Sequence, residues 1–409
     1  MEEWKEYKLE ELGTIVGGAT PSTKEPYNYD GSISWITPKD LSNHCGRYIS
    51  HGERMITPEG YNSCSCKMLP KGSVLFSSRA PIGYVAIAAN ELCTNQGFKS
   101  IIPDERLVDV TFLYYLLINN KAMIEGLGSG TTFKEVSGNV MKNVVVKIPN
   151  LEIQRRIANI LSSLDDKIEM NRRINDNLEQ QAQALFKSWF VDFEPFKKGE
   201  FVESELGMIP YGWRVGTLNE LGDIVGGSTP SKAKPEYYTN EGIAWLTPKD
   251  LSISQRKFTS KGEIDITQEG YESCSTKLMP KGSVLFSSRA PIGYITIAKN
   301  DICTNQGFKS VIPKLAGTAF LYCFLKESTQ EIENKATGST FKEASGALMK
   351  SLPAIIPEKT VLDDFENLLS PLFHQQEVVE EENFHLSSLR DSLLPRLMSG
   401  ELKISEINM

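Results

Sequence analysis

The pattern of apolar and polar positions divides the chain into two kinds of segment. In residues 1–150 and 213–357, short runs of alternating apolar and polar residues lie between glycine- and proline-rich stretches, for example at 33–36. Alternation with period two predicts short β-strands that end at turns. Residues 111–118 and 318–325 are longer apolar stretches that favour one helix in each segment. Each segment is therefore expected to be a mixed α/β module.

After each module the pattern changes to heptad spacing. Residues 151–190 contain no proline or glycine, and apolar positions recur at alternating steps of four and three, as they do again in 358–409. Two long helices are predicted, either packed on their own modules or, as we favour, paired with each other. Asn175 and Asn383 align between the two stripes and would help to set the register. The positions expected at the pairing seam are Leu164, Ile168, Asn175, Leu178, Leu185, Leu372, Val379, Asn383, Leu386 and Leu393.

The two modules are copies of one another. Residues 71–84 return unchanged as 281–294, and when both stretches are extended to 71–100 and 281–310, 25 of 30 positions agree. Such a long period indicates duplication of a whole domain together with its connector.

The predicted order is a first module at 1–150, a helix at 151–194, a charged Pro- and Gly-containing linker at 195–212, a second module at 213–357 and a second helix at 358–409. The expected fold class is α+β: two homologous mixed α/β domains joined by two long helices that pair as an antiparallel coiled coil. This order predicts an internal pseudo-two-fold.

The composition offers little support for catalysis. No apolar run approaches the roughly 18 residues of a membrane span, and the N-terminus lacks a signal-peptide pattern, so a cytoplasmic protein is expected. Cys64 and Cys66 could suggest metal or redox chemistry, but the second copy keeps only Cys274, which favours a structural role. The histidines have no counterparts across the repeat, and no P-loop is present. No catalytic or metal site is therefore predicted.

The net charge of −8 is unevenly distributed. The two modules together carry +2, while residues 151–212 and 358–409 together carry −10. An acidic chain therefore does not exclude nucleic-acid binding by a local basic face of a module.

Four motifs shared by the modules resemble those of a known family. In the first copy they are Gly-Gly-Ala-Thr-Pro-Ser at 17–22, Trp-Ile-Thr-Pro-Lys-Asp-Leu at 35–41, Phe-Ser-Ser-Arg-Ala-Pro-Ile-Gly at 76–83 and Thr-Asn-Gln-Gly-Phe at 94–98. They resemble the target recognition domains of type I restriction-modification specificity subunits, and the helical segments resemble that family's spacer helices. The similarity covers nearly the whole chain. One departure is that the second helix has Asp-Asp-Phe-Glu at 363–366 and lacks the Gln-Arg-Arg-Ile of the first.

The resemblance implies a non-catalytic subunit that binds double-stranded DNA. Its implied partners are two methyltransferase (modification) subunits and, in the full complex, restriction/translocase subunits; no membrane is involved. This chain would bind no cofactor, and S-adenosylmethionine, ATP and Mg²⁺ would belong to the partner subunits. Each module would read half of a split target, and the helices would set the gap. The alternatives are an assembly scaffold without base readout, a subunit of a methylation-only system and a stand-alone DNA-modifying enzyme.

The similarity of the modules adds the expectation that the half-sites are identical and inverted. The copies diverge at 42–56 and 252–266, where a base-reading loop could differ. The arginine of the Ser-Ser-Arg motif could reach a guanine edge or a phosphate, or it could be tied to a carboxylate. The Asn-Gln pair could contact adenine or shape a turn, and the lysines could contact phosphates. The residues expected to contact DNA are Lys39, Ser77, Ser78, Arg79, Asn95, Gln96, Lys99 and Lys134, with Lys249, Ser287, Ser288, Arg289, Asn305, Gln306, Lys309 and Lys342 in the second copy.

Overall fold

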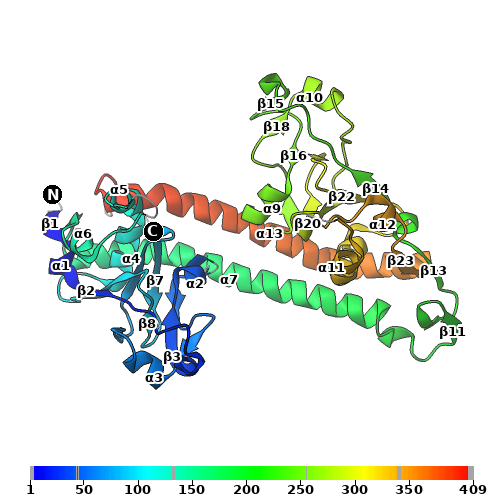
Figure 1. The fold of residues 1–409 in the computed structure, drawn as a ribbon. Coiled ribbons are helices and arrows are strands. Elements are labelled where there is room, and N and C mark those ends of the chain that lie inside the picture. Colours follow the sequence, from blue (N-terminus) through cyan, green and yellow to red (C-terminus); the bar gives the residue numbers. More distant parts are fainter. Residues whose placement is uncertain are drawn as a thin grey trace. The chain divides into compact units, whose positions relative to one another are not determined.

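The computed structural model describes residues 4–42, 44, 46–130, 134–254, 256–338 and 342–403 (Figure 1). The chain forms two compact units. Unit 1 comprises Met1–Met170 and Asn383–Met409, and unit 2 comprises Asn171–Glu382. Each unit therefore combines one module with parts of both long helices.

The centre of unit 1 is a five-stranded sheet in the order β2-β9-β6-β7-β4. Its strands are β2 (Gly13–Gly17), β9 (Lys99–Pro103), β6 (Val74–Ser78), β7 (Ile82–Ala88) and β4 (Tyr48–Ile49). All neighbours are antiparallel except β4 and β7. A smaller sheet joins β5 (Met55–Ile56), β3 (Tyr29–Ile36) and β8 (Cys93–Thr94).

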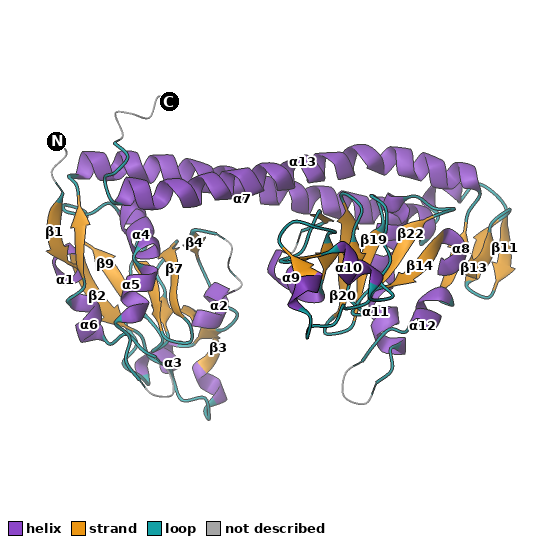
Figure 2. Ribbon diagram, turned by 90° about the horizontal axis from the view of Figure 1, so that it is seen from above, coloured by secondary structure: helices purple, strands orange, loops and turns teal. Residues whose placement is uncertain are grey.

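Short helices and a closing strand pair complete the module of unit 1 (Figure 2). The helices are α1 (Leu9–Leu12), α2 (Pro38–Ser42), α3 (Pro58–Asn62), α4 (Val110–Asn119), α5 (Lys121–Gly126) and α6 (Gly138–Lys142). β1 (Lys5–Lys8) pairs antiparallel with β10 (Val145–Ile148), which joins the beginning of the module to its end.

Unit 2 repeats this sheet order as β14-β22-β19-β20-β17. The strands are β14 (Gly222–Gly226), β22 (Lys309–Pro313), β19 (Val284–Ser288), β20 (Ile292–Ala298) and β17 (Phe258–Thr259). The smaller pairs are β15 (Tyr238–Thr239) with β18 (Asp265–Ile266), β16 (Trp245–Leu246) with β21 (Cys303–Thr304), and β13 (Arg214–Thr217) with β23 (Pro353–Ile356). The prediction of two homologous mixed α/β domains is confirmed.

The helices of unit 2 differ from those of unit 1 at one place. They are α8 (Leu218–Leu221), α9 (Pro248–Ser254), α10 (Gln268–Glu272), α11 (Thr318–Lys335) and α12 (Gly346–Lys350). α11 is continuous where unit 1 has α4 and α5. Asn120 lies at the break, and its side chain donates to the carbonyl oxygen of Leu116 at 2.8 Å.

The segment predicted to be a linker has structure of its own. β11 (Phe201–Ser204) and β12 (Gly207–Pro210) form an antiparallel hairpin there. Gly207 has a φ of +96°, a conformation that favours glycine and suits a tight turn.

The two predicted long helices are α7 (Leu151–Phe190) and α13 (Lys359–Met398). They run antiparallel and lie side by side within each unit (Figures 1 and 2). In unit 2, Asn171 donates to the carboxylate of Glu382 at 2.8 Å, while Phe190 packs against Phe365 with a centroid separation of 4.8 Å. Residues later in α7 therefore lie beside residues earlier in α13, as expected for antiparallel helices.

The residues predicted at the seam lie away from solvent. Ile168 and Val379 are buried, and the half-buried positions are Leu164, Asn175, Leu178, Leu185, Leu372, Asn383, Leu386 and Leu393. Gln376 donates to the backbone oxygen of Asn175 at 3.3 Å.

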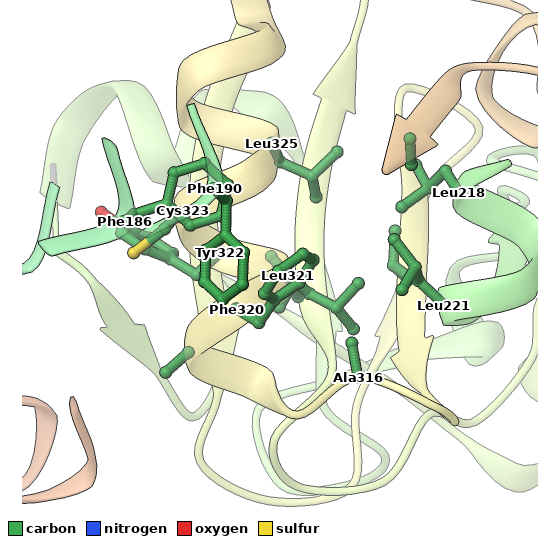
Figure 3. Close-up of a cluster of buried hydrophobic side chains, with 14 of the residues drawn as sticks. Phe186, Phe190, Leu218, Leu221, Ala316, Phe320, Leu321, Tyr322, Cys323 and Leu325 are labelled. Carbon is green, nitrogen blue, oxygen red and sulfur yellow. The ribbon is translucent and has the colours of Figure 1, made fainter. Parts of the chain in front are cut away.

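The helices pack on the modules as well as on each other. In unit 2, Phe186 and Phe190 of α7 belong to the same core as Phe320 of α11 and Leu218 of α8 (Figure 3). In unit 1, Leu161 of α7 joins the core of the first module together with residues near the end of α13. The two interpretations of the heptad stripes are therefore both realised.

Candidate functional site

Several repeated motifs converge on one set of loops in each module. In unit 1 the loop cluster, as we call it, comprises residues 18–21, 78–81, 94–97 and 134–135. Backbone hydrogen bonds tie it together: Ala19 N donates to Thr94 O at 3.0 Å, Ser78 N to Gly97 O at 2.7 Å and Val136 N to Ser78 O at 3.0 Å. The corresponding cluster in unit 2 comprises 227–230, 288–291, 304–307 and 342–343. Segments far apart in the sequence therefore form one fixed surface feature.

The second glycine of the Gly-Gly motif is required by this convergence. A Cβ atom on Gly18 would lie 2.1 Å from the carbonyl oxygen of Asn95, and one on Gly227 would lie 2.1 Å from that of Asn305. Both obstacles are backbone atoms, which cannot move aside as a side-chain end could. Only glycine permits these two loops to approach so closely.

The serines of the Ser-Ser-Arg motif are part of the framework. Ser77, Ser78, Ser287 and Ser288 have side chains that are 0% exposed. The Ser77 hydroxyl donates to Pro81 O at 2.8 Å, and the other three hydroxyls also donate to backbone oxygens. The expectation that these serines contact DNA directly does not agree with this geometry, because their polar atoms face the interior.

Arg79 and Lys99 share a carboxylate. Arg79 lies 3.5 Å and Lys99 lies 3.2 Å from opposite oxygens of Glu135. In unit 2, Arg289 and Lys309 lie 3.6 and 3.1 Å from Glu343. The arginine is thus tied to a carboxylate, as one interpretation expected, yet its side chain remains 33% exposed in unit 1 and 36% exposed in unit 2.

The Asn-Gln pair divides into a turn residue and an exposed residue. Asn95 Oδ1 accepts from Gly97 N at 2.8 Å, an Asx turn that shapes the loop. The neighbouring Gln96 is exposed, and its Oε1 accepts from the hydroxyl of Thr20. In unit 2 the same contacts are made by Asn305, Gln306 and Thr229. The glutamine is the residue of this pair that presents an amide to solvent.

The remaining predicted contacts are exposed lysines. Lys39 and Lys249 pair with Glu53 and Glu263 at 2.7 and 2.8 Å. Hydrogen bonding to Glu53 raises the pKa of Lys39. Lys134 and Lys342 are also exposed, and the ammonium group of Lys342 lies 3.5 Å from the carbonyl oxygen of Glu333.

The divergent segment contains a buried cation in each unit that sequence reasoning missed. The Arg47 side chain is 8% exposed and lies 2.7 Å from Asp166 and 3.9 Å from Asp165 of α7. Asp165 also pairs with Arg390 of α13 at 2.7 Å. Arg47 therefore ties the first module to α7, and Asp165 in turn links α7 to α13.

Lys257 is the aligned residue of the second module. Its ammonium group lies 2.7 Å from both Glu179 Oε2 and Gln376 Oε1, and 3.5 Å from the centre of the Phe373 ring. Burial by itself raises the pKa of Glu179, but the Lys257 ammonium more than offsets this, so the carboxyl pKa lies below its usual value. Arg47 and Lys257 are basic residues at aligned positions of otherwise divergent segments, and this pattern could have indicated a shared role.

Two kinds of feature are absent from the part of the chain that the structure describes. There, no group of three or more His, Cys, Asp or Glu side chains is arranged to hold a metal ion. No described helix is both long and apolar enough to cross a membrane.

Comparison with known proteins identifies clear relatives. A family model described as the type I restriction modification DNA specificity domain matches residues 1–180 and 210–376. The MjaIX specificity subunit of Methanocaldococcus jannaschii is 36% identical, over 99% of this chain and 95% of that protein. The HindI specificity subunit of Haemophilus influenzae is 26% identical, over 98% and 100%. The crystal structure of an S subunit from M. genitalium has the same fold, with a TM-score of 0.58, 18% identity and coverage of 97% of this chain and 96% of that chain.

Proposed function

Because this chain belongs to the type I restriction-modification DNA specificity family, we propose that it directs its complex to a split DNA target, one half of which is read by each module. The chain contributes recognition and assembly, while its partners carry out the chemistry. The partners are two methyltransferase subunits and, in a full complex, restriction/translocase subunits. S-adenosylmethionine, ATP and Mg²⁺ are assigned to these partners.

The observation that carries this proposal is the duplicated loop cluster. Each module presents an exposed glutamine and a partly exposed arginine and lysine, held in equivalent contacts. Arginine suits guanine edges and phosphates, lysine suits phosphates and glutamine suits adenine. A site for small-molecule chemistry has no comparable need for two copies of the same polar surface.

The two half-sites are proposed to be the same sequence in inverted orientation. Modules that agree at 25 of 30 positions in their central stretch present the same donors and acceptors. If a two-fold axis relates them, they contact the two strands equivalently. The divergent segments 42–56 and 252–266 are where the two half-sites would differ: Arg47 and Lys257 are buried against the helices, but His51 and Arg54 are exposed.

The long helices are proposed to set the gap between half-sites and to dock the methyltransferase subunits. Large apolar side chains that remain exposed on the helices support the docking role, because such residues are favourable in protein interfaces. Among the described residues these are Met170 and Ile174 of α7 and Leu368, Val378, Phe384 and Leu389 of α13.

A selection experiment tests this function. The full chain, co-purified with its methyltransferase subunit, would be mixed with duplexes of random sequence, and the bound duplexes would be sequenced. The proposal predicts enrichment of two short elements at a fixed separation. A complex that forms but enriches no sequence would instead identify the chain as an assembly scaffold.

A further inference from the structure

One carboxylate in each loop cluster holds two cations that would otherwise face solvent. The Glu135 side chain is 37% exposed and lies within 3.5 Å of both Arg79 and Lys99. Lys99 also lies 3.4 Å from the Ser78 hydroxyl. Glu343 is 36% exposed and holds Arg289 and Lys309 in the same way. Each loop cluster therefore carries two cations that share one carboxylate, which neutralises one of the two positive charges.

The position of this carboxylate is fixed by the backbone on both sides. Glu135 N donates to Ser129 O at 2.9 Å, Ser129 N donates to Glu135 O at 3.1 Å, and Val136 N donates to Ser78 O. In unit 2, Glu343 and Thr337 exchange the equivalent hydrogen bonds at 2.9 and 3.3 Å. Because both modules anchor the carboxylate in this way, its position is part of the structure of the loop cluster.

A carboxylate and a phosphate diester compete for the same donors. Both present anionic oxygens to arginine and lysine, and such charge-assisted hydrogen bonds are stronger than neutral ones. A partly exposed ion pair contributes little to stability, so an incoming phosphate can replace the carboxylate at small cost. The contrast is with Lys257, whose 6% exposed side chain is not accessible to a ligand.

We propose that Glu135 and Glu343 are internal counterions that occupy the place of a DNA backbone phosphate in the free protein and give it up when target DNA binds. This inference rests on the proposed function. On arbitrary DNA the carboxylates stay in place, and one of the two positive charges in each cluster remains neutralised. On the target, base contacts hold the duplex close enough for phosphate to replace them. The two glutamates thereby weaken non-specific binding and increase discrimination.

The test is the pair of isosteric substitutions Glu135→Gln and Glu343→Gln in the full chain. Glutamine keeps the side-chain shape and a hydrogen-bond acceptor but loses the charge. Affinity for a labelled duplex of arbitrary sequence would be measured by fluorescence anisotropy over a series of salt concentrations. Each freed phosphate contact steepens the slope of log K against log salt by about 0.9, which is about an eightfold gain at 0.1 M salt. With one contact per module, the double variant is expected to gain about sixtyfold.

The matched control removes the same charge elsewhere on each module. Glu6 pairs with Lys147 at 3.4 Å, and Asp223 pairs with Lys314 at 3.3 Å, both exposed and outside the loop clusters. The E6Q/D223N variant is expected to gain much less. If a thermal melt shows that E135Q/E343Q is unfolded, E135D/E343D replaces it in the test. Aspartate shortens the same carboxylates and should shift the affinity in the same direction.

The possible results separate the two claims. Tighter, more salt-dependent binding of arbitrary DNA by E135Q/E343Q than by the control supports the counterion role. If the parent enriches a target while E135Q/E343Q binds arbitrary DNA no tighter than the control, the inference is overturned and the proposed function stands. If the parent shows no DNA binding of either kind, both are overturned.

Discussion

Replacing the buried Lys257 by methionine should destabilise unit 2 far more than an ordinary surface substitution. Methionine is of similar length and keeps the contact with the Phe373 ring, but it removes the cation that faces Glu179 at 2.7 Å. Breaking one side of a buried ion pair typically costs about 3–5 kcal/mol because the other charge is left without a partner. Since the Glu179 side chain keeps 23% exposure, we expect the lower end, about 3 kcal/mol.

The loss should depend on pH in a defined direction. In the parent, Lys257 holds the pKa of Glu179 below its usual value of 4.5, so the pair stabilises the fold above that pH and loses this contribution on acidification. Lys257→Met removes the main group that lowers the Glu179 pKa, while burial still raises it. In the parent, burial also lowers the pKa of Lys257, so the ion pair is lost as Lys257 loses its proton at alkaline pH. The variant should therefore be most destabilised near neutral pH, and the deficit should shrink both on acidification and at alkaline pH.

Urea unfolding at several pH values measures this deficit, and hydrogen exchange of α11 assigns it to unit 2. Lys249→Met is the control, because it removes the same charge from a 67% exposed side chain and should leave the free energy of unfolding nearly unchanged. The K257M/E179Q double variant should recover part of the loss. A cost for Lys257→Met equal to that of Lys249→Met, or one that does not change with pH, would refute the reasoning.

Three further predictions concern the loop cluster. Arg79→Ala with Arg289→Ala should weaken target binding by about 1–3 kcal/mol per module if each arginine reads a base. Arg106→Ala changes an 88% exposed residue outside the cluster and should leave binding unchanged. If the anisotropy curves of the two variants were equal, the arginines of the cluster would not contact DNA. Ser77→Ala should lower the free energy of unfolding by about 1–3 kcal/mol, because Tyr84 N loses its acceptor; an unchanged urea midpoint would contradict this. Gly18→Ala should lower the free energy of unfolding by about 1–3 kcal/mol, because the added Cβ overlaps Asn95 O. Gly126→Ala should be tolerated, because no atom lies within 4 Å of its added Cβ. Equal melting temperatures for the two variants would contradict this.

Periodicity and internal repetition were sufficient to predict the two modules and the two long helices. A duplicated stretch such as 71–100 leaves little freedom for the copies to fold differently, and a stripe that runs for several heptads specifies a helix wherever its partner lies. The hydrophobic pattern alone could not show which elements the two long helices pack against. Leu185 is at a predicted seam position, whereas its neighbour Phe186 and, one turn later, Phe190 enter the core of a module, which depends on three-dimensional proximity.

Prediction of the site was limited by the direction of individual side chains. Ser77 and Gln96 are both polar residues on repeated loops, yet only Gln96 is exposed, because the Ser77 hydroxyl supports the turn that follows it. Arg47 and Lys257 lie in the segments that seemed most suited to base contact, yet their charges point to carboxylates on α7. Which charge meets a helix and which meets solvent follows from tertiary packing, which spacing along the chain does not encode.

The claim that two equivalent modules read DNA is tested most directly by the sites that the complex modifies. The chain would be co-expressed with its methyltransferase subunit in cells that lack other modification, and methylated positions would be mapped by single-molecule sequencing. The account predicts one short sequence and its inverted copy, separated by a fixed gap. Two unrelated half-sites would contradict the equivalence of the modules, and methylation without any sequence preference would contradict the recognition role itself.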